Sequence, residues 1–374
     1  MGFWPVVIVG ATLFVAYANG ANDNFKGVAT LFGSGTSDYR KSLAWATLTT
    51  LAGSLTALFL ATELVSIFQG KGLLPDGLVQ SQSYLAAVIL GAALTVLLAT
   101  KVGMPISTTH GLTGALVGAG MVAVGMELGF QTLLGKFFAP LLISPLVAVS
   151  ASAIGYPLFS RLLKLSGMNR ESCVCVAEEE MATIATPQGA LFVETTPGLR
   201  IIVDAAGVCA QPAAGTLLGI GVQKILDAGH FISAGSVSFA RGLNDTPKIV
   251  ALGLAVSVLD LTWSIVLVAA TMALGGIVHS RKIAETVSKR ITGMDTDHGF
   301  AANLVTSFLV IFASKWGLPV STTHVSCGAL FGIGIANGQA RWAVIRTILM
   351  AWVLTLPTAA LLSAGIFLIL RTFA

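Results

Sequence analysis

The sequence predicts an all-α, polytopic membrane protein made of two inverted-topology repeats, with about ten to twelve transmembrane segments that include re-entrant or broken helices. The 374 residues are 55% hydrophobic and only 10% charged, whereas roughly 25% of residues are charged in soluble domains. Such a chain cannot form an ordinary water-facing surface. The other two observations behind this fold class are long apolar runs and polar phrases that occur once in each half.

Several apolar runs are long enough, or nearly so, to cross about 30 Å of hydrocarbon as helices. They are residues 43–67, 84–99, 133–159, 256–278, 301–313 and 343–370. Membrane β-strands need only about ten residues and alternate polar with apolar side chains. These runs are longer and alternate weakly, so helices are expected instead of a barrel.

Two polar phrases are duplicated inside the apolar sequence. Residues 20–26 match residues 242–248 as G-x-N-D-x-x-K. Residues 103–110 match residues 317–324 as G-x-P-x-S-T-T-H, and the match continues to 11 identities in 18 positions. Duplicated polar phrases in apolar sequence indicate a secondary transporter with internal repeats, whose ligands bind where interrupted helices meet.

The repeats divide the chain into a first transmembrane repeat (1–160), a polar linker (161–215) and a second repeat (216–374). Lys and Arg mark cytoplasmic loops. They follow the first N-D helix at Arg40 but lie one helix later in the second half, at Arg281. The halves are therefore expected to be inverted and the linker to be a cytoplasmic connector. The net charge of +4 reflects this orientation bias, and no basic stripe suggests a nucleic-acid partner.

The S-T-T phrases should open new helices inside the membrane. Gly and Pro end the preceding helix, and the hydroxyl residues that follow are favoured at a helix start. Backbone N–H groups, the positive helix end and the hydroxyls could then converge on an oxyanion. The alternative is a plain capped helix within a bundle. The candidate substrate-binding residues are Ser107, Thr108, Thr109, Ser321, Thr322 and Thr323.

The N-D pairs contain acidic residues, so they would bind a cation instead of an anion. Asp23 and Asp245 lie in otherwise apolar helices, where an unpaired carboxylate costs about 3 kcal/mol on the insertion scale, so each should have a partner. Asn and Asp oxygens suit a hard cation such as Na⁺. The alternatives are a proton-carrying carboxyl, or an ion pair with Lys26 or Lys248, which lie three residues on and thus on the same helical face.

With these motifs, the chain resembles the inorganic phosphate transporter (PiT) family, over both repeats. The resemblance implies a homodimeric, multi-pass symporter that moves phosphate with Na⁺ or, in other members, with H⁺. It assigns the six Ser and Thr residues to phosphate and the coupling cations to Asn22, Asp23, Asn244 and Asp245, with accessory candidates at Asn24, Lys26, Lys248 and Asp260. The sequence departs from the family pattern where an acidic residue is often found: it has Thr50 there, and Asp260 is taken as the counterpart in the second half.

The predicted function is import of inorganic phosphate across the cell membrane (plasma or inner) by Na⁺-coupled alternating access. No enzymatic activity is expected, and no cofactor apart from Na⁺ as coupling ion. The alternatives are an H⁺-coupled phosphate transporter or a sulfate permease on the same scaffold. Less favoured are an anion channel and an intramembrane hydrolase using Ser107, His110 and Asp23, because a hydrolase needs one such set instead of two related sets.

Overall fold

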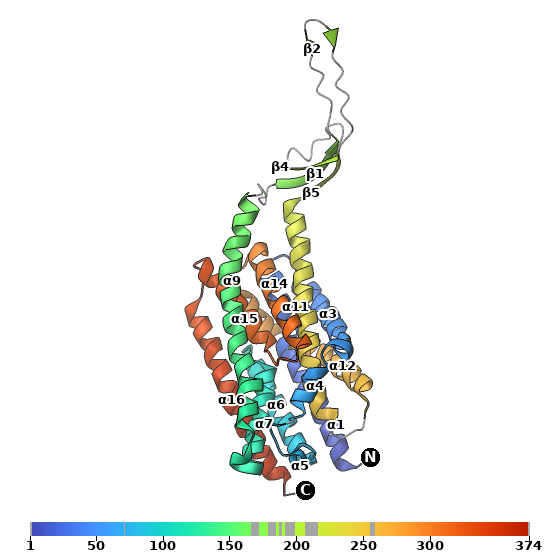
Figure 1. The fold of residues 1–374 in the computed structure, drawn as a ribbon, viewed down its shortest axis with the longest axis vertical. Coiled ribbons are helices and arrows are strands. Elements are labelled where there is room, and N and C mark those ends of the chain that lie inside the picture. Colours follow the sequence, from blue (N-terminus) through green and yellow to red (C-terminus); the bar gives the residue numbers. More distant parts are fainter. Residues whose placement is uncertain are drawn as a thin grey trace. The chain divides into compact units, whose positions relative to one another are not determined.

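The computed structural model describes residues 2–70, 72–165, 172–178, 185–186, 189–190, 199–205, 216–254 and 259–372. The chain forms two compact units. One unit contains Met1–Tyr156 and His230–Ala374, and the other is Pro157–Gly229. Helices fill the first unit (Figure 1).

In the larger unit, all regular secondary structure among the described residues is helical, which confirms an all-α membrane fold. The α-helices are α1 (Phe3–Asp23), α2 (Ala29–Gly33), α3 (Tyr39–Leu60), α4 (Thr62–Phe68), α5 (Asp76–Val79), α6 (Gln82–Val102), α7 (Thr108–Val124), α8 (Phe130–Thr132), α9 (Ala139–Leu165), α11 (Val222–Gly253), α12 (Leu261–His279), α13 (Arg281–Lys289), α14 (Thr296–Lys315), α15 (Thr322–Ala336) and α16 (Trp342–Leu370). Within the described residues, seven helical stretches are long and apolar enough to cross a membrane, and α15 is a shorter apolar helix.

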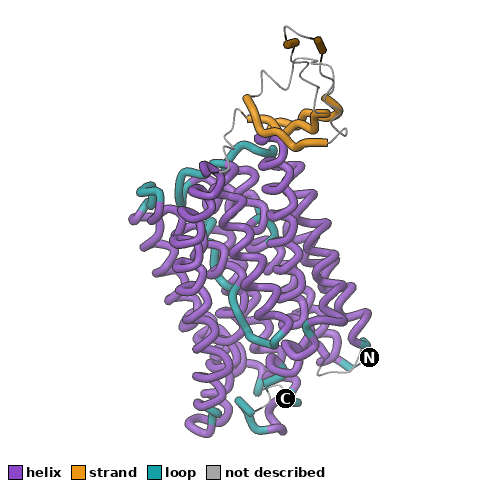
Figure 2. Tube along the Cα trace, turned by 45° about the horizontal axis from the view of Figure 1, so that its top comes forward, coloured by secondary structure: helices purple, strands orange, loops and turns teal. Residues whose placement is uncertain are grey.

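The strands lie in the smaller unit, and all but the last fall within the predicted polar linker, residues 161–215 (Figure 2). The last strand begins at residue 216, where the second transmembrane repeat was predicted to start. The strands are β1 (Ser172–Glu178), β2 (Ala185–Thr186), β3 (Gly189–Ala190), β4 (Leu199–Ala205) and β5 (Thr216–Gly221). The first sheet has the order β4-β1-β5 and is antiparallel, with residue 172 opposite 205 and residue 173 opposite 221. The second pairs β2 with β3.

Two predicted segments differ from the helices observed. The run 43–67 is divided, because α3 ends at Leu60 and α4 begins at Thr62. The run 256–278 corresponds to α12, which begins only at Leu261, and its first residues, 256–258, lie outside the described residues. The run 343–370 is α16 almost residue for residue.

The structure confirms that the Gly-Pro phrases interrupt helices. Helix α6 ends before Gly103, which has a left-handed φ of 75°, and Gly317 follows α14 with a φ of 68°. Glycine adopts this conformation without the steric cost of a side chain. New helices, α7 and α15, then begin after N-cap residues Ser107 and Ser321. In Figure 1, α6 and α7 lie in the lower half of the bundle, whereas α14 and α15 lie in its upper half.

The halves interlock through glycines. A Cβ on Gly20 of α1 would overlap the backbone carbonyl of Met272 in α12, and a Cβ on Gly242 of α11 would overlap the carbonyl of Thr50 in α3. The first helix of each half therefore packs backbone to backbone on a helix of the other half, as small residues permit in membranes. Figure 1 shows α1 and α11 running in opposite directions.

This packing corrects one match between the halves. Since Gly20 and Gly242 are equivalent, the residue equivalent to Thr50 is Met272 and not Asp260. Asp260 instead caps α12 as Asp38 caps α3, each accepting a hydrogen bond from the backbone N–H three residues on. Both are exposed ends of helices, so Asp260 does not belong to the buried polar cluster described below.

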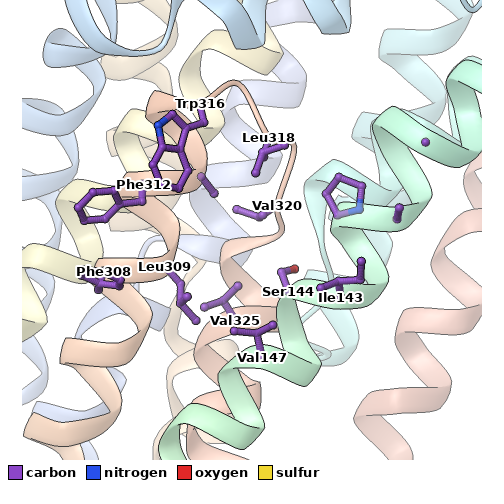
Figure 3. A pocket seen from close by; sticks show the side chains of 14 residues that line it. Ile143, Ser144, Val147, Phe308, Leu309, Phe312, Trp316, Leu318, Val320 and Val325 are labelled. Carbon is purple, nitrogen blue, oxygen red and sulfur yellow. The ribbon is translucent and has the colours of Figure 1, made fainter.

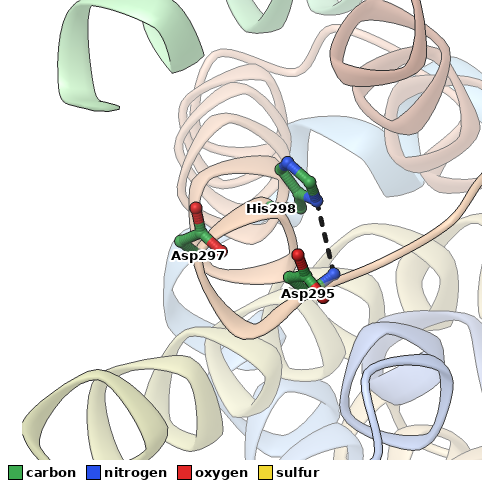
Figure 4. A group of neighbouring side chains, drawn as sticks. All are labelled: Asp295, Asp297 and His298. Carbon is green, nitrogen blue, oxygen red and sulfur yellow. Dashed lines mark hydrogen bonds between the residues drawn. The ribbon is translucent and has the colours of Figure 1, made fainter. Parts of the chain in front are cut away.

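Helix α14 begins at a group of neighbouring acidic and imidazole side chains (Figure 4). Asp295 and His298 form a reciprocal capping box, in which the Asp295 backbone N–H donates to His298 Nδ1 at 3.3 Å. Tyr156 donates a hydrogen bond to Asp297 at 3.4 Å. Because these contacts satisfy the first turn of α14, the group acts as a helix start.

Candidate functional site

The two helix breaks meet inside the bundle. The hydroxyl of Thr323, in the first turn of α15, donates to the carbonyl of Ile106 at 2.9 Å. The hydroxyl of Thr109, in the first turn of α7, donates to the carbonyl of Val320 at 3.4 Å. Each S-T-T phrase therefore contacts the extended segment that precedes the other, and the two helix N-termini converge from opposite halves of the chain.

Both helix starts are capped in the same way. The hydroxyl of Ser107 accepts the backbone N–H of His110 at 3.1 Å, and that of Ser321 accepts the backbone N–H of His324 at 3.2 Å. The imidazoles of these histidines lie next to each other, with centroids 4.3 Å apart and ring planes tilted by 49°. The Ser107 hydroxyl thus completes a helix cap, and its observed hydrogen bond involves the backbone of His110 and not the imidazole that a hydrolase would use.

Asp23 is only 1% exposed and lies beside the start of α7. Its Oδ2 accepts from the amide of Asn19 at 2.9 Å and from the hydroxyl of Thr108 at 3.0 Å. Its Oδ1 contacts the ammonium group of Lys26 directly. One carboxylate therefore receives an ion pair and two neutral hydrogen bonds, which offsets the cost of its burial.

Asp245, the equivalent carboxylate, faces two cations. Lys248 Nζ lies 3.7 Å from Oδ1, and Arg241 Nε lies 3.8 Å from Oδ2. The amides of Asn244 and Asn19 donate at 3.0 and 3.3 Å. Asn19 therefore contacts both carboxylates and links the two N-D phrases.

Each lysine donates a hydrogen bond to the S-T-T phrase of the other half. Lys26 Nζ donates to the hydroxyl of Thr323 at 2.7 Å, and Lys248 Nζ donates to that of Thr109 at 2.8 Å. The structure brings together the N-D, Lys and S-T-T residues that the sequence predicted from separate helices. Of the three partners considered for the aspartates, the one the structure shows is the ion pair with lysine.

Comparison with known proteins places the chain in a family. A sequence model described as the phosphate transporter family matches residues 19–363, which include both N-D phrases and both S-T-T phrases. The chain belongs to the phosphate transporter family. The resemblance seen in the sequence is thereby confirmed, and the chain is a multi-pass membrane protein of a transporter family.

Relatives and one solved structure extend the likeness over nearly the whole chain. A Pyrococcus abyssi protein provisionally named a phosphate permease is 26% identical over 98% of both chains. An Arabidopsis thaliana protein named inorganic phosphate transporter 2-1, chloroplastic, is 28% identical over 94% of this chain and 69% of its own. A solved structure described as the sodium-dependent phosphate transporter has a TM-score of 0.77 and 20% identity over 100% of both chains. That last likeness shows the fold alone.

Arg241 also belongs to the buried polar cluster, although it was not among the residues predicted from the sequence. Its side chain is 2% exposed and donates to the amide oxygens of Asn19 at 2.6 Å and Asn24 at 3.1 Å, and to the hydroxyl of Thr50 at 3.4 Å. The predicted accessory residue Asn24 therefore accepts a hydrogen bond from an arginine. A lone Arg directly before G-x-N-D, inside an apolar helix, was the signal that could have identified it.

The two asparagines of the N-D phrases donate hydrogen bonds to residues at the helix breaks. Asn22 donates through its amide to the hydroxyl of Thr100 at 2.9 Å and to the carbonyl of Met104 at 3.1 Å. Asn244 donates to the carbonyl of Val320 at 3.1 Å. In this structure the amide hydrogens therefore support the non-helical backbone, which would otherwise leave polar groups unsatisfied in the membrane.

The buried cluster carries more positive than negative charge. Among the described residues, the buried Asp, Glu, Lys and Arg side chains are Asp23, Lys26, Arg241, Asp245 and Lys248. In their ionised forms they comprise three cations and two anions, an excess of one positive charge. The converging helix N-termini add positive potential. An anion bound there would balance this excess, because an uncompensated buried charge is costly.

An apolar pocket nearby is a less suitable anion site (Figure 3). It has a volume of about 430 Å³ and is bounded by Val147, Phe308, Trp316, Val325 and their neighbours. Side chains of this kind offer few donors to phosphate oxygens. The polar cluster between the helix breaks is therefore the candidate substrate site.

Proposed function

We propose that this chain is a secondary transporter that imports inorganic phosphate across the cell membrane by alternating access. The observation that carries the proposal is the meeting of two S-T-T helix starts, each contacted by a buried lysine from the other half. Phosphate oxygens would be held by the hydroxyls and backbone N–H groups of both starts and by the excess positive charge around them.

Access would alternate because the site is built from two inverted repeats. Helices α1 and α11 run in opposite directions and each packs on a helix of the other half. Movement of one repeat against the other would open the shared site first to one side and then to the other. We also propose that the chain forms a homodimer and lies in the cell membrane, as predicted from the sequence.

Na⁺ coupling at Asn22, Asp23, Asn244 and Asp245 stays a prediction. The oxygens of the two aspartates lie beside lysine ammonium groups. A Na⁺ ion that used both carboxylates would have to displace these groups or share the oxygens with them.

Sulfate is the second candidate substrate, because the same ion pairs leave no carboxylate free to select phosphate. Inorganic phosphate at neutral pH still carries one or two hydroxyls that can donate hydrogen bonds, whereas sulfate at neutral pH only accepts them. A free carboxylate would therefore select phosphate. Asp23 and Asp245 instead face cations, so the family assignment supplies the preference for phosphate.

Uptake of radiolabelled phosphate into proteoliposomes that contain the purified chain tests the function. We expect accumulation above empty liposomes that excess unlabelled phosphate competes away and excess sulfate does not. The double variant Thr109→Ala, Thr323→Ala should raise the KM for phosphate about tenfold or more, since each change removes a hydroxyl at the site. Thr347→Ala removes an exposed hydroxyl that bonds only its own helix and is the matched control.

Either of two results would contradict the proposal. Uptake that sulfate blocks and phosphate competes poorly would assign the site to sulfate. An unchanged KM in the double threonine variant would remove the helix starts from the substrate site.

A further inference from the structure

The ammonium group of Lys26 lies inside a set of oxygens that resembles a cation site. It donates to the amide oxygen of Asn22 at 2.8 Å, the carbonyl of Ile106 at 2.8 Å and the hydroxyl of Thr323 at 2.7 Å, and it contacts the carboxylate of Asp23. The side chain is buried. These four oxygens come from three separate segments of the chain, which close around the nitrogen.

Lys248 repeats the arrangement in the second half. Its Nζ donates to the hydroxyl of Thr109 at 2.8 Å and the carbonyl of Val320 at 2.7 Å, and lies 3.7 Å from the carboxylate of Asp245. It is 1% exposed. The second ammonium group therefore also has carboxylate, hydroxyl and backbone oxygens around it, in the place that corresponds to the first.

Carboxylate, carbonyl and hydroxyl oxygens are the ligands that hard cations take. An ammonium group is a compact, strongly hydrated point charge with three donors, so the same oxygens can replace its water. A Na⁺ ion bound to these oxygens would lie within a few ångströms of the ammonium charge. Such like charges repel strongly where water is excluded, so the residues present do not fit Na⁺ while the lysines stay in place.

We propose that Lys26 and Lys248 are tethered cations that occupy the two positions predicted for coupling Na⁺, so that this chain transports its anion without Na⁺. The lysines neutralise the aspartates in every turnover and remain with the protein. Arg241 then leaves the cluster positive before the substrate arrives, and no free cation has to bind first. The proposal rests on the proposed transport function, which it deepens by assigning the charge partner.

Phosphate uptake by the unmodified chain in Na⁺, K⁺ or N-methylglucamine buffers of equal ionic strength and pH is the main test. We expect initial rates that differ by less than about twofold, because Na⁺ has no differential affinity for the states of the transporter if it does not bind. Uptake that requires Na⁺, or radiolabelled Na⁺ that enters with phosphate in a fixed ratio, would overturn the proposal.

A binding measurement separates this proposal from the transport function. The thermal unfolding midpoint of the purified chain should be the same in NaCl and KCl, since an ion that does not bind the native state cannot stabilise it. A rise specific to Na⁺ would overturn the lysine proposal whatever the substrate is. Absence of phosphate uptake in every buffer would instead refute the proposed function, and the unfolding result would still decide the role of the lysines.

Replacing the lysines sharpens the test. Lys26→Asn with Lys248→Asn removes both ammonium groups and leaves the aspartates free to bind a cation. We expect uptake in K⁺ to fall at least about tenfold and to recover partly in Na⁺, together with a Na⁺-specific rise in the unfolding midpoint. Lys41→Asn is the matched control, because Lys41 also pairs with an aspartate three residues away but is exposed. A double variant that folds and shows normal, Na⁺-independent uptake would overturn the proposal.

Discussion

The two halves of the site use the same residue types but distribute their charges differently. In the first half, Asp23 contacts one cation, Lys26, directly. In the second half, Asp245 lies between Lys248 and Arg241, at 3.7 and 3.8 Å. The duplicated motifs therefore produce equivalent positions with unequal electrostatics. One half forms a tight pair, whereas in the other a carboxylate lies at longer distance from two cations.

A single pair of equivalent positions accounts for this difference. The residue before Gly242 is Arg241, and the residue before Gly20 is Asn19. Asn19 donates to both carboxylates and accepts a hydrogen bond from Arg241 at 2.6 Å. An asparagine in one half thus bridges the two halves, while the arginine in the other half supplies the charge that an anion would balance.

The largest expected effect comes from removing the carboxylate that serves two cations. Asp245→Asn should destabilise the protein by about 3–5 kcal/mol, because Arg241 and Lys248 would both lose their carboxylate inside the membrane. Asp23→Asn should cost less, about 3 kcal/mol, since only one cation, Lys26, would lose a carboxylate that it contacts. Unfolding midpoints in detergent would rank the two variants, and uptake should be impaired in both.

Asp38→Asn is the control for these variants, because Asp38 is exposed and Asn is an equally good helix cap. Equal losses for Asp23→Asn and Asp245→Asn would mean that Arg241 does not depend on Asp245. The electrostatic difference between the halves would then have no energetic consequence.

A smaller effect is expected when the second half is made to match the first. Arg241→Asn should cost about 1–3 kcal/mol, because the side-chain oxygens of Asn19 and Asn24 would lose a donor. It should also raise the KM for phosphate, since the buried cluster would no longer carry excess positive charge. Arg40→Asn, at an exposed position, tests for a general effect of lost charge. An Arg241→Asn variant with an unchanged KM would show that the arginine is structural only.

Local rules explain why the sequence predicted so much of this site. Gly103 and Pro105, only two residues apart, favour the end of a helix, and Ser107 favours a new start, so the break could be placed from the sequence. The spacing of Asp23 and Lys26 made their ion pair one of three alternatives. The same motifs lie within residues 19–363, which match the phosphate transporter family.

Tertiary packing explains what the sequence could not predict. The contact of Lys26 with Thr323 joins residues 297 positions apart, and no local pattern states which half a lysine will reach. Asp260 was matched with Thr50 by residue type, whereas the glycine contacts that set the equivalence appear only in the folded bundle. A lone Arg241 in an apolar helix has no motif, so its role emerged from its buried partners.

The smallest expected effect concerns the two helix caps, for which the two halves should show equal losses of stability. Ser107→Ala and Ser321→Ala each remove one cap from a buried helix start, with serine-to-amide distances of 3.1 and 3.2 Å. Each should cost about 1 kcal/mol, the usual value for an N-cap, and the two losses should be equal within error because both caps have the same geometry. Thermal unfolding of the single variants beside Ser66→Ala, a partly exposed serine that does not cap a helix start, would measure this. A clearly larger loss for one of the two caps would show that the electrostatic difference between Asp23 and Asp245 extends to the helix starts themselves, and the asymmetry would then belong to the whole site instead of to Arg241 alone.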